Sequence, residues 1–158
     1  MLDKRIEAAV RRGVGVFGEK LSVPQKLDDA IQYSVFPGGA RIRPTILLSV
    51  AVACGDDNPS LADASAAALE MIHCASLVHD DLPCFDNAET RRGKPSVHNK
   101  YGEPTAVLVG DSLIANAFGV IARASDKDAV RAAKLIALLS KYTGFPKGIC
   151  AEIGRAHV

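Results

Sequence analysis

The residues "SLADASAAALEMIHCASLVHD", Ser60–Asp80, decide the fold class. Positions that share one face recur there at three- and four-residue steps: Leu69, Ile72, Ala75, Ser76 and His79. This spacing is typical of a helix with one face toward the interior of a helical bundle. The cluster "GDDNPS", 55–60, precedes it as a turn, with Ser60 as the expected N-cap. The stretch therefore predicts one long helix.

The rest of the chain has a similar character. Alanine- and leucine-rich segments dominate, and the alternation of Val, Ile and Thr that a half-buried strand needs is nearly absent. Glycines and prolines mark the breaks between segments. We expect helices at about 2–12, 25–35, 44–54, 60–80, 104–123 and 127–141. The predicted fold class is all-α, without a domain boundary.

The composition narrows the class of protein. The chain has 158 residues, of which 48% are hydrophobic and 23% charged, with a formal net charge of +1. It can bury one core, and without an overall basic charge we expect no nucleic-acid partner. The apolar runs at 45–54 and 104–122 are too short or are interrupted by Asp111 and Asn116, so we expect no stable membrane insertion. Widely spaced cysteines and the lack of a leader favour a cytoplasmic protein.

Two short motifs suggest other activities. The stretch "GVGVFG", 13–18, matches a dinucleotide-binding pattern, but a charged helical segment precedes it where a strand is required. We expect a flexible connector there. The stretch "GDSL", 110–113, resembles a serine-hydrolase signature, yet it lies inside an apolar helix without the sharp turn that exposes a nucleophile. We expect a helix with a buried polar residue at this point.

A cluster of acidic side chains ends the long helix. Asp80, Asp81 and Asp86 lie in "DDLPCFD", 80–86. Mg²⁺ is usually held by one or two carboxylates together with water and substrate phosphate oxygens, so the cluster suits Mg²⁺. On a straight helix Asp80 and Asp86 point apart, and a break at Pro83 would let them face one cavity. The alternative is an acidic pair that only ends the helix.

Basic side chains flank the acidic cluster in the sequence. Arg91 and Arg92 follow it, and guanidinium groups bind phosphate oxygens through paired hydrogen bonds. Upstream, "GGARIRP", 38–44, places Arg41 and Arg43 at the start of a helix, whose N-terminus carries partial positive charge. Its glycines allow a ligand to approach the backbone closely. We expect two anion sites, one bridged by metal through the aspartates and one held by arginines directly.

These blocks resemble the trans-isoprenyl diphosphate synthase (polyprenyl synthetase) family, the head-to-tail prenyltransferases that make geranyl, farnesyl and geranylgeranyl diphosphates. The resemblance rests on "GGARIRP", "MIHCASLVHDDLPCFDNAETRRGKPSVH" and "YGEPTAVLVGDSLIANAF", and it covers most of 38–118. It implies the α-helical bundle of isoprenoid synthases. It also implies that "DDLPCFD" is the first aspartate-rich motif of that family in its longer form.

The resemblance implies a role for individual residues. Asp80 and Asp86 would ligate Mg²⁺ that bridges the allylic diphosphate, with Asp81 near the same cluster. Arg91 would contact the allylic diphosphate, and with the three aspartates it would form the catalytic set. The diphosphate of isopentenyl diphosphate would be held by Arg43, His73 and Arg92.

The implied reaction begins with departure of the allylic diphosphate, whose developing charge Mg²⁺ and arginines stabilise. The double bond of isopentenyl diphosphate attacks the resulting carbocation, a proton is lost, and the apolar interior excludes water. Two alternatives stay open. A non-catalytic partner subunit of such a synthase would not need all three motif aspartates. A terpene cyclase ionises a diphosphate but has no second substrate, so it would not need the basic residues of "GGARIRP".

The resemblance also suggests the length of the product. In this family the growing chain enters a tunnel beside the aspartate-bearing helix, and bulky side chains one turn before the motif close that tunnel. Ala75 and Ser76 occupy this turn, and both are small. Within the C15–C20 range we therefore expect the twenty-carbon geranylgeranyl diphosphate.

The chain departs from the family pattern at two positions and in length. Ala40 stands where the family usually has lysine, and Asn87 where a further aspartate is common. Family members are about twice as long and lie in one large domain, so we expect 1–151 to be the N-terminal half of a bundle, inactive alone and a homodimer when full length. The second aspartate-rich motif is absent.

Residues 152–158 back-translate to what looks like a sequencing adapter, so we expect a non-native tail there rather than an ordinary polar terminus.

Overall fold

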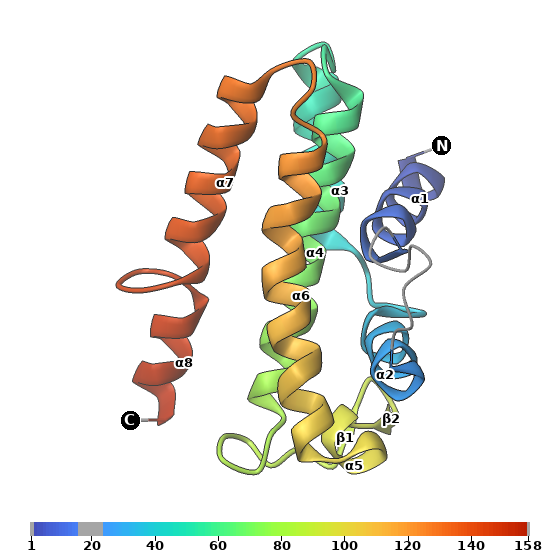
Figure 1. The fold of residues 1–158 in the computed structure, drawn as a ribbon, viewed down its shortest axis with the longest axis vertical. Helices are drawn as coiled ribbons and strands as arrows, with labels where there is room; N and C mark the ends of the chain where they lie inside the picture. Colours follow the sequence, from blue (N-terminus) through green and yellow to red (C-terminus); the bar gives the residue numbers. More distant parts are fainter. Residues whose placement is uncertain (1, 16–23, 158) are drawn as a thin grey trace.

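The computed structural model describes residues 2–15 and 24–157, and these are mostly helical (Figure 1). A two-stranded antiparallel hairpin joins β1 (Thr90–Arg91) to β2 (Lys94–Pro95). The predicted all-α class is confirmed. The helices, in chain order, are α1 (Leu2–Gly15), α2 (Gln25–Val35), α3 (Ile42–Ala53), α4 (Pro59–Asp80), α5 (Val97–Tyr101), α6 (Glu103–Arg123), α7 (Ala129–Thr143) and α8 (Ile149–His157).

Helix α4 is the central element of the bundle. Helix α6 runs along it, and α1 and α3 pack against other parts of its surface (Figure 1). Three consecutive residues, Ala66, Ala67 and Ala68, are fully buried. Since consecutive residues on a helix point about 100° apart, α4 is covered on most sides at this level. The sequence predicted one buried face, which was too narrow an expectation.

Small residues let the neighbouring helices approach α4 closely. A Cβ at Gly13 of α1 would lie 2.7 Å from the Cβ of Ala67, and a Cβ at Gly110 of α6 would overlap the imidazole of His79. Protein interiors are close-packed, so a larger residue at either glycine would force the helices apart. Gly13 and Gly110 thus set the distances of α1 and α6 from the central helix.

The same two glycines open the motifs that suggested other activities. We expected a flexible connector at "GVGVFG", 13–18, but residues 13–15 continue α1, and residues 16–18 lie outside the described part of the chain. A helix precedes Gly13 where a dinucleotide site needs a strand, in agreement with the prediction. "GDSL" lies within α6, as predicted, but Asp111 is exposed rather than buried. Its side chain faces solvent next to His79.

The predicted helix positions are confirmed within three residues at each end. Ser60 is not the cap of α4: Asn58 is, because its side-chain oxygen accepts a hydrogen bond of 3.2 Å from the N–H of Leu61. Helix α5 and the hairpin were not predicted, since elements of five and two residues are too short to show a period. Helix α8 was not predicted either. It overlaps 152–158, whose non-native origin stays a prediction.

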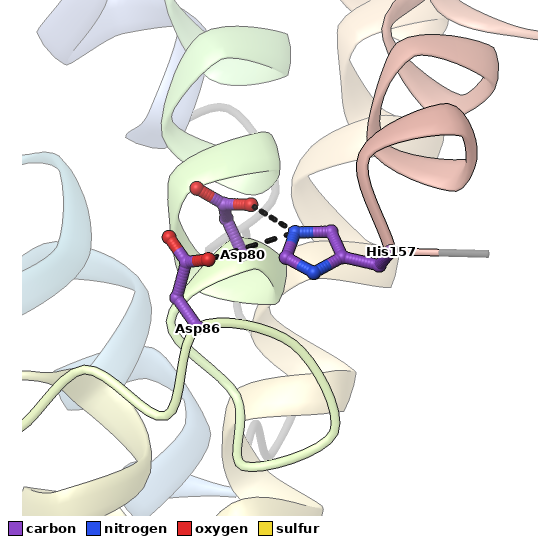
Figure 2. Close-up of side chains that lie close together, drawn as sticks. All are labelled: Asp80, Asp86 and His157. Atoms are coloured by element: carbon purple, nitrogen blue, oxygen red, sulfur yellow. Dashed lines mark ion pairs between the residues drawn. The ribbon is translucent and has the colours of Figure 1, made fainter.

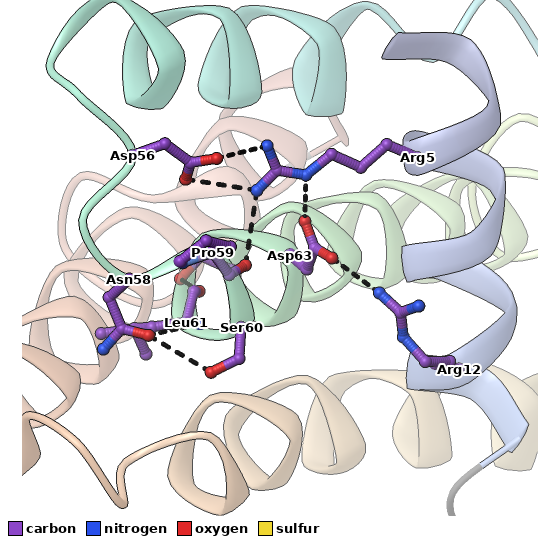
Figure 3. A network of polar contacts seen from close by, with 9 residues as sticks. Arg5, Arg12, Asp56, Asn58, Pro59, Ser60, Leu61 and Asp63 are labelled. Atoms are coloured by element: carbon purple, nitrogen blue, oxygen red, sulfur yellow. Dashed lines mark hydrogen bonds and ion pairs between the residues drawn. The ribbon is translucent and has the colours of Figure 1, made fainter. Parts of the chain in front are cut away.

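An arginine–aspartate network fixes α1 against the start of α4 (Figure 3). Arg5 contacts Asp56 through Nη1 at 2.5 Å and Asp63 through Nε at 2.6 Å. Arg12, two turns along α1, contacts the second oxygen of Asp63 at 2.6 Å. Partly exposed ion pairs contribute only about 0–1 kcal/mol each, so the network sets the register of α1 more than the stability of the fold.

Within residues 2–15 and 24–157, two helices are long and apolar enough to span a membrane. They are α4 and α6, with 67% of the most apolar part of α4 and 39% of that of α6 buried inside the bundle. Core helices of soluble proteins meet the same criteria. The expectation that the protein does not insert stably into a membrane therefore stays a prediction.

Candidate active site

The chain reverses direction where α4 ends. The helix stops at Asp80, and the N–H of Asp86 donates a hydrogen bond of 3.0 Å to the carbonyl oxygen of Asp80. The N–H of Ala88 likewise reaches the carbonyl of Asp81 at 3.1 Å. Pro83 lies in this turn, where its missing N–H cannot continue the helix. The predicted break in the helix is confirmed.

This turn brings two of the predicted metal ligands together (Figure 2). One carboxylate oxygen from each of Asp80 and Asp86 and a ring nitrogen of His157 all lie within 4.8 Å of one another. The Nε2 atom of His157 is 3.5 Å from Asp86 and 3.7 Å from Asp80. His157 was not predicted as a member of this cluster, and it lies in 152–158, whose non-native origin stays a prediction.

The two aspartates suit a hard divalent cation. Burial, followed by the negative charge of Asp86, raises the pKa of Asp80 above its usual value. The Asp86 side chain is 49% exposed, so solvent reaches the pair. Two solvent-accessible carboxylates match the way proteins hold Mg²⁺, which keeps water and substrate oxygens as its other ligands. The donor set therefore fits Mg²⁺, and the metal role of both residues stays a prediction.

Asp81 has a different partner from this pair. Its side chain is 3% exposed and accepts hydrogen bonds from Arg91, whose Nε lies 3.0 Å from one carboxylate oxygen and 3.1 Å from the other. The bond to Asp81 raises the pKa of Arg91. The same guanidinium reaches within 4.0 Å of Asp80. Asp81 was expected near the metal cluster, and its observed contact is with the arginine beside that cluster.

The hairpin turn separates the two adjacent arginines. Arg92 and Gly93 occupy its central positions with φ of +54° and +73°. Two consecutive positive φ values are the signature of the tight hairpin turn whose twist matches the strands. Arg91, in β1, contacts Asp81, whereas the guanidinium of Arg92 lies against Gly39. Neighbours in the sequence thus have different partners.

The second predicted anion site gathers around His73 on α4. Burial lowers the pKa of His73, and the positive charge of Arg43 lowers it further. The negative charge of Glu70 opposes this shift, and Arg92 and Arg91 add smaller lowering contributions. Arg43 and Arg92 are exposed and make no hydrogen bond or ion pair within the described part of the chain. Arg43, His73 and Arg92 therefore share one region, in which the two arginine charges have no ion-pair partner among the described residues. Such a region attracts an anion.

Arg41 does not belong to this region, contrary to the expectation from "GGARIRP". Its side chain is 6% exposed and forms ion pairs with Glu70 of α4 at 2.6 Å and with Glu7 of α1 at 2.9 Å. Both carboxylates come from distant segments, so the sequence of the motif alone gave no sign of this burial. Of the two arginines in the motif, only Arg43 is available to a ligand.

A family model described as polyprenyl synthetase matches residues 24–144. The chain belongs to the polyprenyl synthetase family. The matched residues include both basic clusters and the whole acidic motif, so the resemblance inferred from those blocks is confirmed.

Known members of the family are similar along nearly the whole chain. The geranylgeranyl diphosphate synthase of Cereibacter sphaeroides is 59% identical over 152 residues, which cover 96% of this chain and 52% of that protein. The farnesyl diphosphate synthase of Geobacillus stearothermophilus is 44% identical over 146 residues, covering 90% and 48%. A geranyltransferase structure from Legionella pneumophila has a TM-score of 0.80 at 36% identity, covering 90% of this chain and 50% of that one. This synthetase-family chain therefore spans about half the length of its relatives.

Proposed function

We propose that these residues belong to a Mg²⁺-dependent prenyltransferase that condenses an allylic diphosphate with isopentenyl diphosphate, head to tail. One observation carries the proposal. Two separate clusters lie near the C-terminal half of α4: the Asp80 and Asp86 pair with Arg91 beside it, and the region of Arg43, His73 and Arg92, whose two arginines have no ion-pair partner among the described residues. A reaction between two diphosphates needs two such anion sites.

The aspartate cluster suits the allylic substrate. Asp80 and Asp86 would hold Mg²⁺, which when bound neutralises negative charge on the departing diphosphate. Arg91 already lies 4.0 Å from Asp80, so its guanidinium can donate to the same diphosphate. Asp81 holds that guanidinium in place before substrate arrives, which reduces the reorganisation needed during reaction.

The second cluster suits isopentenyl diphosphate. Arg43 and Arg92 carry fixed positive charges without a partner in the described residues, and the lowered pKa of His73 keeps its ring neutral at neutral pH. A neutral imidazole can still donate one hydrogen bond to a diphosphate oxygen. Ala40 stands where the family usually has lysine, so we propose that binding here depends on the two arginines.

The turn before the motif supports a long product within the C15–C20 range. Ala75 is fully buried, and Ser76 is partly buried with its Oγ donating to the carbonyl of His73 at 2.9 Å. Neither side chain is large enough to close a tunnel along α4. The 59% identical relative is named a geranylgeranyl diphosphate synthase, which also supports a twenty-carbon product.

We further propose a cytoplasmic homodimer for the complete protein. All four cysteines are free, which agrees with a reducing compartment. Large apolar side chains are exposed on two neighbouring helices, α6 and α7, as expected for a surface that a second subunit covers. These side chains are Val107, Leu108, Val130, Leu138 and Tyr142.

The test requires a chain of the length of its relatives. In a completed chimera, residues 1–151 are followed by the C-terminal part of the Cereibacter sphaeroides relative. We expect release of one pyrophosphate for each isopentenyl diphosphate consumed, only when an allylic diphosphate and Mg²⁺ are both present. A chimera that melts cooperatively but consumes the allylic substrate alone would favour the cyclase. One that consumes neither substrate would favour the non-catalytic partner subunit.

A further inference from the structure

Arg41 connects three elements at the edge of the second anion site. Its Nη1 contacts Glu70 of α4 at 2.6 Å, and its Nε contacts Glu7 of α1 at 2.9 Å. Its Nη2 donates to the carbonyl oxygen of Val35, the last residue of α2, at 3.0 Å. The guanidinium also lies over the ring of Phe36, 5.6 Å from the centroid. Its polar contacts are thus made within the protein.

The backbone of Arg41 is unusual as well. It is the residue before α3 and has φ of +48°, in the left-handed region that residues with a Cβ rarely adopt. Such a conformation persists only where surrounding contacts hold it. It sets the direction in which α3 leaves the turn. Arg43 lies two residues later, so the position of Arg41 determines where the side chain of Arg43 begins.

The same turn contacts Arg92. A Cβ at Gly38 would overlap the guanidinium of Arg41, and a Cβ at Gly39 would lie 3.1 Å from the Cζ of Arg92. Lys94 ties the hairpin to this turn through a bond of 3.1 Å from its Nζ to the carbonyl of Phe36. The two glycines therefore accommodate arginine side chains of the protein itself. The sequence suggested instead that they let a ligand approach.

The burial of an ion pair at this point needs an explanation other than stability. A buried ion pair is often no more stabilising than an apolar pair of similar volume, because both charges lose their hydration. Arg41 and Glu70 can fix the orientation of the turn, which an apolar pair cannot do. Charged hydrogen bonds hold the guanidinium, and through it the turn, in one orientation.

We propose that Arg41, held by Glu70, is a positioning residue that places Arg43 and Arg92 for isopentenyl diphosphate. The proposal rests on the proposed function of this site. Arg41 does not touch the substrate. It acts through the backbone of residues 38–43, which carries Arg43 and lies against Arg92. The allylic site, built from the turn after α4, does not depend on it.

Two conservative substitutions in the completed chimera test this. Arg41→Lys keeps a charge but loses the fixed geometry, and Glu70→Gln removes the buried partner. In both we expect KM for isopentenyl diphosphate to rise about tenfold, because small misplacements of binding groups have large effects. KM for the allylic diphosphate should stay within about twofold. The matched control is Glu7→Gln, since Glu7 binds the same guanidinium but is 38% exposed. Glu7→Gln should raise KM for isopentenyl diphosphate clearly less than Glu70→Gln does.

A third variant covers the case in which the ion-pair variants fold poorly. Gly39→Ala leaves the ion pair intact and places a methyl group against the guanidinium of Arg92. It should raise KM for isopentenyl diphosphate without lowering the melting temperature. The proposal is overturned if folded variants change both KM values equally or neither. Failure of the unsubstituted chimera to consume isopentenyl diphosphate would instead overturn the proposed function.

Discussion

The backbone N–H of Asp86 donates a hydrogen bond of 3.0 Å to the carbonyl oxygen of Asp80. On a continuous helix these two residues would point in directions about 120° apart. The turn around Pro83 replaces the next helical turn and brings both carboxylates to one side. The longer spacing of this motif is therefore compatible with a single metal cluster.

Removing either carboxylate should abolish most of the activity. In the completed chimera, Asp80→Ala or Asp86→Ala removes a metal ligand whose charge stabilisation is worth several kcal/mol, or about two to four orders of magnitude in turnover. The measurement is the initial rate as a function of Mg²⁺ concentration. Asp57→Asn is the control, because Asp57 is exposed and paired with Arg131. Near-normal rates in both alanine variants at limiting Mg²⁺ would disprove the metal assignment.

Asp81 should act on the allylic site through Arg91. Asp81→Asn removes the charge that holds the guanidinium, so we expect KM for the allylic diphosphate to rise about tenfold. The free energy of unfolding should fall by about 1–2 kcal/mol. This is less than for a fully buried ion pair, because the Arg91 side chain is 36% exposed to solvent. Urea denaturation and steady-state kinetics measure the two effects. A rise in KM for isopentenyl diphosphate alone would contradict this role.

The ring of His73 should report anion binding. Its pKa lies below the usual value because of burial and of the charge on Arg43. Inorganic pyrophosphate bound at Arg43 and Arg92 would offset that charge, so the His73 pKa, followed by NMR in the completed chimera, should rise. In an Arg43→Gln variant it should start higher and respond less. A pKa that pyrophosphate leaves unchanged would argue against an anion site here.

The lowered pKa of His73 also predicts the direction in which the free energy of unfolding changes with pH. The unfolded chain takes up the proton of His73 near its ordinary pKa of about 6.5, at a higher pH than the folded chain does. Above the pKa of His73 in the unfolded chain, neutral His73 therefore contributes fully to the free energy of unfolding. This contribution is lost as the pH falls toward the pKa of His73 in the folded chain. A His73→Gln variant should show a smaller loss of stability than the parent across this window in urea denaturation. An identical pH dependence would contradict the prediction.

The local features of the site could be predicted from sequence, and the long-range contacts could not. The periodicity of 60–80 and the proline in the acidic motif were enough for α4 and its end. By contrast, Arg41 and Arg43 look equivalent in "GGARIRP", and only the three-dimensional positions of Glu7 and Glu70 distinguish them. The close approach of the His79 ring to Gly110, which leaves no room for a Cβ there, likewise depends on how two helices cross.

Ala75 should set the length of the product. It is fully buried on α4, one turn before Asp80. Ala75→Tyr in the completed chimera would overpack the interior beside α4, and we expect the cost of overpacking to fall on the longer product. We expect the main product to shorten from twenty to fifteen carbons or fewer, measured by chromatography after dephosphorylation. A parent that stops at fifteen carbons, or a variant with the original product ratio, would refute this.

The 158-residue chain without a C-terminal addition should be inactive and should self-associate. Four large apolar side chains are exposed along α3, at 54–61% of their surface: Ile42, Ile46, Val50 and Val52. Exposed apolar faces of this kind favour association. Sedimentation velocity and binding of a hydrophobic dye measure this directly. A monomeric sample that melts cooperatively and converts both substrates would show the expectation to be wrong.

The central claim is that two diphosphate sites meet near the end of α4, and the adjacent pair Arg91 and Arg92 tests it most directly. Each loses one charged contact when substituted by Gln, worth about 1.5–3 kcal/mol, or about ten- to hundredfold in affinity. The measurement is KM for each substrate in Arg91→Gln and Arg92→Gln forms of the completed chimera. We predict that Arg91→Gln raises KM mainly for the allylic diphosphate and Arg92→Gln mainly for isopentenyl diphosphate. If both substitutions affect the same substrate, or both substrates equally, the two-site account is contradicted.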